Sequence, residues 1–140
     1  PLSMTSPIII NTTIEAPVEK VWELWTTPKH IKEWNSASAD WHTPVATNDL
    51  RPGGAFLSRM EAKDGSFGFD FSGIYDEVKE HEFISYSLAD GRKVTIAFTG
   101  DDKTTTITET FDPENENSRD MQRDGWQAIL NNFKAYAEEN

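Results

Sequence analysis

The three histidines are the first side chains to test for chemistry, because imidazole binds metals and transfers protons near neutral pH. They are His30, His42 and His81, and their spacing matches neither H-x-x-x-H nor H-E-x-x-H. The chain has no cysteine, which excludes a thiolate nucleophile, a disulfide and a zinc knuckle. We therefore expect no metal centre.

Sequence motifs of nucleotide-binding and acyl-transfer enzymes are also missing. No G-x-S-x-G elbow occurs, and the run 65–68 (GSFG) is neither a phosphate-binding loop nor a dinucleotide fingerprint. This argues against a serine hydrolase, a kinase and a dehydrogenase. We expect no cofactor.

Glu109 is the most informative charged residue. It has the parity of Ile107 and Phe111 in a β-rich run, and alternate residues of a strand lie on one face of a sheet. An inward carboxylate needs a partner or has a raised pKa, and it could then orient a ligand or act as an acid or base. The alternative is a carboxylate that reaches solvent near the strand end. Arg59 and Asp70 have the outward parity in their strands and are expected to be solvated.

The segment from Trp34 to His42 combines two tryptophans with asparagine, aspartate and histidine. Tryptophan offers a broad contact area and polar groups fix orientation, so this segment could form the mouth of a ligand pocket. His42 is the second candidate acid or base. The alternative is a surface loop whose Trp34 and Trp41 plug the end of the core.

Length and composition bound the class of protein. A chain of 140 residues suits one domain, which we expect at 7–140 after a disordered end at 1–6. The apolar content of 36%, with 8 Phe, 5 Trp and 3 Tyr, excludes disorder of the whole chain. A net charge of −11 repels nucleic-acid phosphates and anionic membranes, so we expect neither partner. No apolar run of about 18 residues occurs, and a cytoplasmic location is predicted.

Residue patterns then give the elements. β-branched residues predict a strand from Ile8 to Ile14. Apolar spacing predicts a helix that begins at Pro17, and Thr27-Pro28 begins a second short helix that ends near Asn35. Strands at 41–47 and 55–62, and later strands joined by short Asp-Gly turns, predict an antiparallel meander.

One strand face and one long helix are expected to cover each other. Alternation places Phe67, Phe69, Phe71 and Tyr75 on one face of the sheet. The final helix is predicted to run for about twenty residues from an N-cap at Asn117 or Ser118. Its apolar stripe runs from residue 121 to 137, and a glycine at 125 indicates close backbone approach or deliberate space.

Short motifs along nearly the whole chain, roughly 8 to 136, occur in a fixed order. They are IEAPVEKVW at 14–22, Trp34, PGG at 52–54, DG at 64–65, GIY at 73–75 and GW at 125–126. In this order they resemble the activator-of-Hsp90-ATPase-like family, which belongs to the START-like (SRPBCC) superfamily.

The resemblance implies an α+β helix-grip fold. In this fold a curved antiparallel sheet of about six to seven strands surrounds a long C-terminal helix, and two short helices follow the first strand. It also implies an internal apolar pocket, for which the alternative is a packed core with small voids. The candidate ligand-binding residues are Trp34, Trp41, His42, Met60, Phe69, Phe71, Tyr75, Tyr86, Phe98, Glu109, Met121, Gly125, Trp126 and Ile129.

The function predicted from these residues and from the resemblance is binding of a small apolar or amphipathic molecule. One alternative is a polyketide cyclase or hydrolase-like enzyme, with His42 or Glu109 as general acid or base. A second alternative is a partner protein that activates a chaperone ATPase. The identity of the ligand stays open, as does the choice between monomer and homodimer.

Overall fold

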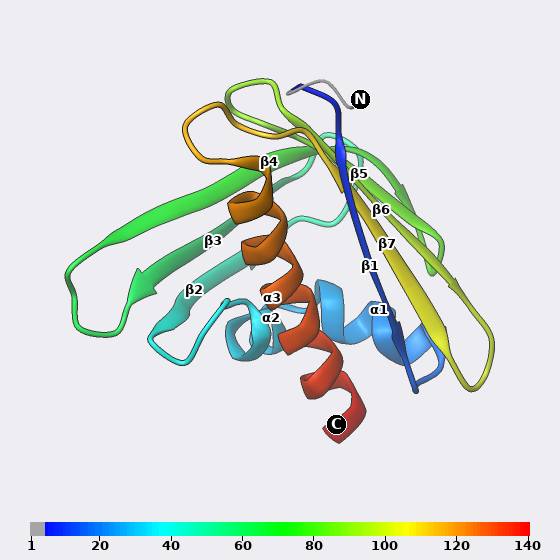
Figure 1. Ribbon diagram of the computed structural model, residues 1–140. Coiled ribbons are helices and arrows are strands. Elements are labelled where there is room, and N and C mark those ends of the chain that lie inside the picture. The colour runs from blue at the N-terminus through cyan, green and yellow to red at the C-terminus, as the bar shows by residue number, and fades with distance from the viewer. Residues whose placement is uncertain (1–4) are drawn as a thin grey trace.

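A seven-stranded antiparallel sheet bends around one long helix (Figure 1). The computed structural model describes residues 5–140. The elements are, in chain order, β1 (Ile8–Ile14), α1 (Val18–Thr26), α2 (Pro28–Trp34), β2 (Trp41–Asn48), β3 (Ala55–Ala62), β4 (Gly68–Lys79), β5 (Phe83–Leu88), β6 (Lys93–Gly100), β7 (Thr105–Phe111) and α3 (Arg119–Glu139). The predicted helix-grip fold is confirmed.

The strand order is β1-β7-β6-β5-β4-β3-β2, so every sequential pair from β2 to β7 is a hairpin. Short turns close these hairpins, and Gly65 and Gly91 adopt the positive φ values of 79° and 91° that such turns require. Helices α1 and α2 connect the two edge strands, β1 and β2. Irregular pairing at Tyr75/Glu77 interrupts the ladder between β4 and β5, in keeping with the bend of the sheet.

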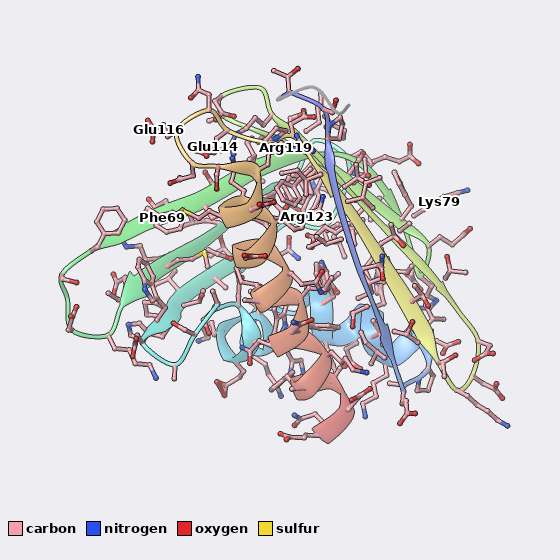
Figure 2. All side chains as sticks on the ribbon, in the orientation of Figure 1. Phe69, Lys79, Glu114, Glu116, Arg119 and Arg123 are labelled. Carbon is pink, nitrogen blue, oxygen red and sulfur yellow. The ribbon has the colours of Figure 1, made fainter. Side chains whose placement is uncertain are left out.

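The first part of β4 is not covered by the helix. Phe67 is 63% exposed and Phe69 is 41% exposed, whereas Phe71 is half-buried and Tyr75 is buried. The prediction that all four side chains face the long helix is therefore wrong for Phe67, whereas Phe69 lines the cavity described below and is covered only in part. The reason is that the β3–β4 hairpin extends beyond α3, as Figure 1 and the labelled Phe69 in Figure 2 show.

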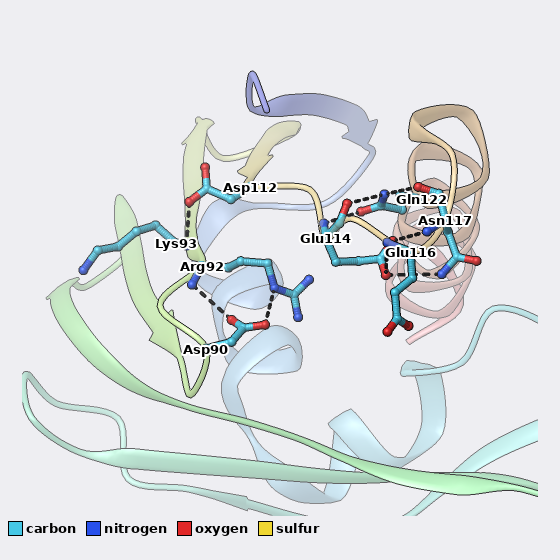
Figure 3. Close-up of polar contacts among 8 residues, drawn as sticks. All are labelled: Asp90, Arg92, Lys93, Asp112, Glu114, Glu116, Asn117 and Gln122. Carbon is cyan, nitrogen blue, oxygen red and sulfur yellow. Dashed lines mark hydrogen bonds and ion pairs between the residues drawn. The ribbon is translucent and has the colours of Figure 1, made fainter. Parts of the chain in front are cut away.

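The N-terminal turn of α3 differs from the predicted stripe. Ser118 is the N-cap and accepts a hydrogen bond from the Met121 amide at 3.1 Å, but Met121 itself is 62% exposed. Gln122 is buried in its stead, because its side chain donates to the carbonyls of Glu114 and Asn117 and accepts from the Glu114 amide (Figure 3). The expected inward position of Met121 is thus wrong.

Gly125 does not pack closely against another element, although a glycine in the apolar stripe of α3 could allow such a contact. A Cβ atom added there would have no other atom within 4 Å, so a close backbone approach is excluded.

Three aromatic rings join the three helices. The ring of Phe133, which is fully buried in α3, lies 4.8 Å from that of Trp25 in α1 and 4.9 Å from that of Trp34 in α2. The two tryptophan rings stack at 4.8 Å, and Trp34 Nε1 donates to the Leu24 carbonyl at 2.9 Å. This aromatic cluster fixes where the C-terminal half of α3 lies.

Side chains of α3 also satisfy the free edge of β1. Arg119 and Arg123, labelled in Figure 2, belong to this set. The donor–acceptor pairs are Arg119 to the carbonyls of Ser6 and Pro7, Arg123 to Ile9, Gln127 to Asn11 and Lys134 to Thr13. The predicted disordered end at 1–6 lies mostly outside the described residues. Ser6 is described, and its carbonyl accepts one of these hydrogen bonds, from Arg119.

In the described part of the chain, no helix is both long and apolar enough to cross a bilayer.

We expect Phe133→Ala to lower the free energy of unfolding by about 3–5 kcal/mol, because it removes a large ring from a fully packed site and leaves a cavity. Urea unfolding monitored by circular dichroism measures the change. Asp124→Ala, on the exposed face of the same helix, is the control and should stay within about 0.5 kcal/mol of the parent. A similar small change for Phe133→Ala would mean that the sheet and the short helices do not grip α3.

Candidate functional site

A cavity of about 310 Å³, partly open to the surface, lies between the concave face of the sheet and the three helices. Its volume is at the lower end of the range of small-molecule pockets. Its walls come from every element except β1. The lining residues are Trp25, Ile31, Trp34, Asn35, Thr47, Asn48, Phe56, Ser58, Met60, Phe69, Phe71, Tyr75, Ile84, Tyr86, Arg92, Ile96, Glu109, Trp126 and Ile129.

Aromatic rings form most of one wall. Trp126 of α3 stacks on Phe111 of β7 with centroids 3.9 Å apart and an interplanar angle of 8°. Phe71 meets the edge of Trp126 at 5.9 Å, and Tyr86 meets Phe56 at 4.7 Å. Rings held by such contacts offer a ligand flat apolar surfaces that need little rearrangement.

Two polar pairs on the wall are already satisfied within the protein. The Tyr75 hydroxyl donates to Asn48 Oδ1 at 2.5 Å, and Asn48 Nδ2 donates to the Thr26 carbonyl at 2.7 Å. Burial raises the pKa of Tyr75 to about 12, so it stays neutral. Asn35 Nδ2 donates to Ser58 Oγ at 3.2 Å.

Glu109 lies on the floor of the cavity and is only 6% exposed. It is paired in the ladder with Ile10 on one side and Ile96 on the other. Its carboxyl group has no hydrogen-bond or ion-pair partner among residues 5–140 and opens onto the cavity. Desolvation raises the pKa of Glu109 to about 8, and the group is therefore mostly protonated at neutral pH.

Tyr86 is the second polar group without a protein partner. It is 7% exposed, and its hydroxyl makes no hydrogen bond within the described chain. Burial raises the pKa of Tyr86 well above its usual value, and the nearby Glu109 charge raises it further. Glu109 is thus close enough to affect the ionisation of Tyr86.

Arg92 places a positive charge at the cavity wall, from the turn between β5 and β6. Its Nε donates to Asp90 Oδ2 at 2.8 Å, as Figure 3 shows. The Arg92 amide also binds Asp90, which lowers the pKa of that carboxyl and keeps the pair ionised.

Nine of the predicted site residues line this cavity. They are Trp34, Met60, Phe69, Phe71, Tyr75, Tyr86, Glu109, Trp126 and Ile129. The inward parity of Glu109 is confirmed, and its alternative position in solvent is excluded.

Five predicted site residues do not line the cavity. Met121 is exposed, as described above, and Gly125 is not among the lining residues. Phe98 is buried beneath α1, against Trp22 at 5.1 Å. Trp41 and His42 line a separate surface pocket beside α2.

The position of His42 follows from strand alternation. Thr43 faces inward and is 2% exposed, so the neighbouring His42 faces outward, where its Nε2 lies 3.6 Å from Glu61 Oε1. Of the two candidate acid–base groups, Glu109 alone faces the cavity. Across residues 5–140 no three His, Asp or Glu side chains come together as metal ligands would.

Several lining residues have no sequence signal that could have placed them there. Asn48 ends a strand and Arg92 lies in a turn, and turn residues follow no burial pattern. Phe56 and Ser58 share the inward parity of Met60, so alternation within β3 could have identified them.

The fold and the cavity together define the class of protein, a START-like helix-grip domain. A family model described as "Activator of Hsp90 ATPase homolog 1-like protein" matches residues 15–138. The chain belongs to this family.

Solved structures agree with this assignment. The AHSA1-like protein from Aeromonas hydrophila is 44% identical, with a TM-score of 0.88 over 95% of this chain and 92% of that chain. Chr148 from Cytophaga hutchinsonii is 53% identical, with a TM-score of 0.82 and the same coverage of 95% and 92%. NE0264 from Nitrosomonas europaea, at 19% identity, has a TM-score of 0.82 over 99% of this chain and 97% of that chain and shares the fold. No protein with a curated functional description matches the chain.

Replacing Glu109 by glutamine should make the protein more stable at neutral and alkaline pH. Between pH 4.5 and about 8 the folded protein keeps a proton that the unfolded chain releases. Each pH unit in this window therefore lowers the parent's free energy of unfolding by about 1.4 kcal/mol relative to a variant without the group. The stability gain of Glu109→Gln should grow from pH 4.5 to 8 and then level off.

Urea unfolding of parent and variant at several pH values measures this difference and cancels the contribution of all other groups. Glu77→Gln, on the exposed side of β4, is the matched control and should show no such trend. A gain that does not change with pH would show that Glu109 titrates normally.

Proposed function

We propose that this protein binds a small, largely apolar or amphipathic molecule in its internal cavity. The observation that carries the proposal is an aromatic cavity of about 310 Å³ with a buried acid, Glu109, that no described residue satisfies. Burial of the ligand's apolar surface would supply affinity, at about 25 cal/mol per Å². Polar groups of the wall would supply orientation.

Charge supports a small molecule over a polyanion. The net charge of −11 disfavours nucleic acid and anionic membrane surfaces. The apolar cavity instead suits a molecule of a few fused or linked rings.

N-phenyl-1-naphthylamine, an uncharged dye whose emission rises in apolar surroundings, tests whether the cavity accepts ligands. We expect saturable fluorescence enhancement and a rise in Tm, because a ligand that binds only the folded state stabilises it. Ile129→Trp fills the cavity from α3 and should abolish both effects. Met121→Trp adds the same ring to an exposed site on α3 and should leave both unchanged.

Native mass spectrometry of protein purified from its own host would then identify a co-purifying molecule. Equal dye binding by Ile129→Trp and the parent would place the dye outside the cavity, against the proposal.

A second candidate function is catalysis, favoured by one observation, the pKa of about 8 of the buried Glu109. An acid with this pKa can donate or accept a proton near neutral pH. If the protein is a cyclase or hydrolase, Glu109→Gln should remove turnover of an aromatic polyketide and leave its binding nearly intact. Unchanged turnover in this variant would exclude Glu109 as the acid or base.

A further inference from the structure

Two buried polar side chains in the cavity have no protein partner, and they lie on the same wall. Tyr86 is in β5 and Glu109 is in β7, separated by β6. Ile96 of β6 is the ladder partner of Glu109, and Val94, two residues earlier, is the ladder partner of Tyr86. The two side chains therefore lie on the same concave face, two strands apart and offset by two residues, which places their backbones about 12 Å apart. The Glu109 charge is still near enough to raise the pKa of Tyr86.

Among residues 5–140 no fully enclosed side-chain nitrogen or oxygen lacks a hydrogen bond, so the polar atoms of Glu109 and Tyr86 open onto the cavity, where a bound molecule can reach them. The other polar side chains of the wall, such as Tyr75, Asn48 and Asn35, bind one another or the backbone. Glu109 and Tyr86 are the pair that a ligand could satisfy.

The charges around the cavity limit what that ligand can be. A cationic group would lie in the field of Arg92, and an anionic group would have to compete with Asp90, which already holds the Arg92 guanidinium. A charged headgroup would also lose its hydration on entry, which costs several kcal/mol. An uncharged oxygen avoids both costs.

We propose that Glu109 and Tyr86 form the recognition site of the cavity and select a ring compound with an uncharged carbonyl or hydroxyl group. This inference rests on the proposed binding function and specifies its ligand class. Both side chains carry an O–H group that donates to the ligand oxygen. The aromatic wall, including Trp126 and Phe71, contacts the ring system.

Binding should then depend on pH through Glu109. The ionisable residues that line the cavity are Glu109, Tyr75, Tyr86 and Arg92, from β7, β4, β5 and the β5–β6 turn. The lining residues from β6 and α3 do not ionise. Because burial raises the pKa values of both tyrosines, Glu109 is the lining carboxyl or hydroxyl group that changes charge between pH 6.5 and 9.5. Loss of its proton removes a donor and adds a buried charge.

A series of 2-substituted naphthalenes separates the headgroups on one scaffold. It contains 2-acetylnaphthalene, 2-naphthalenemethanol, 2-ethylnaphthalene, 2-naphthalenemethylammonium and 2-naphthoate, each titrated by isothermal calorimetry at pH 6.5. We expect the ketone and the alcohol to bind at least about tenfold more tightly than the hydrocarbon, as one good hydrogen bond gives, and than either ion. The affinity for the ketone should be roughly 30-fold lower at pH 9.5 than at pH 6.5, from the pKa of about 8.

Variants assign the effect to residues. Tyr86→Phe and Glu109→Leu should lower affinity for the ketone toward that of 2-ethylnaphthalene, and the affinity for this hydrocarbon reports whether the cavity is intact. Glu109→Gln keeps a donor, so it should retain ketone binding within a few-fold and lose the pH dependence. Glu77→Gln, outside the cavity, should behave like the parent.

The outcomes separate this inference from the binding function itself. Equal affinity for the ketone and the hydrocarbon, or tightest binding of the ammonium or the carboxylate, overturns the inference and leaves the binding function standing. A pH dependence that persists in Glu109→Gln also overturns it. No binding of any naphthalene, including the hydrocarbon, overturns both.

Discussion

The attachment of α3 to the free edge of β1 is the constraint on which the rest of the structure depends. In an antiparallel strand, alternate carbonyls point away from the paired neighbour, and those of β1 accept hydrogen bonds from side chains spaced along α3. The same contacts protect a sheet edge that would otherwise be open to another chain. With one side of the helix tied to this edge and its C-terminal half packed between Trp25 and Trp34, α3 crosses the sheet at a distance from the middle strands. The cavity occupies that space.

The cavity is therefore a consequence of how the helix is held, and its lining reflects both packing and recognition. Most wall residues are large rings that contact one another at fixed angles, which keeps the space open and shaped. Glu109 destabilises the folded protein, because its burial without a partner favours the unfolded chain at neutral pH. A side chain that costs stability and faces a cavity is best explained by what it binds.

The extended β3–β4 hairpin carries part of a second aromatic cluster, which lies outside the core. There Trp41, Phe67 and Phe69 contact one another, with ring centroids 6.1 to 6.3 Å apart, on a part of the sheet that α3 does not cover. Phe69 belongs both to this partly exposed cluster and to the cavity wall. The cavity and the outer aromatic surface are thus continuous through one side chain.

Local periodicity and turn residues predict the element order and the turns from the sequence, narrow the N-cap to Asn117 or Ser118, and give Glu109 the parity of its inward neighbours. The structure chose Ser118 and the inward position of Glu109. Tertiary structure decided which apolar residues are covered. Alternation gives Phe67 and Tyr75 the same parity, yet Phe67 is exposed and Tyr75 is buried. The reason is that α3, which is distant in sequence, covers only part of the sheet. The same reason removed Met121 from the cavity and brought Arg92 and Asn48 to it. Which side chains converge on one space depends on how the sheet bends and where α3 crosses it, and no local pattern records either.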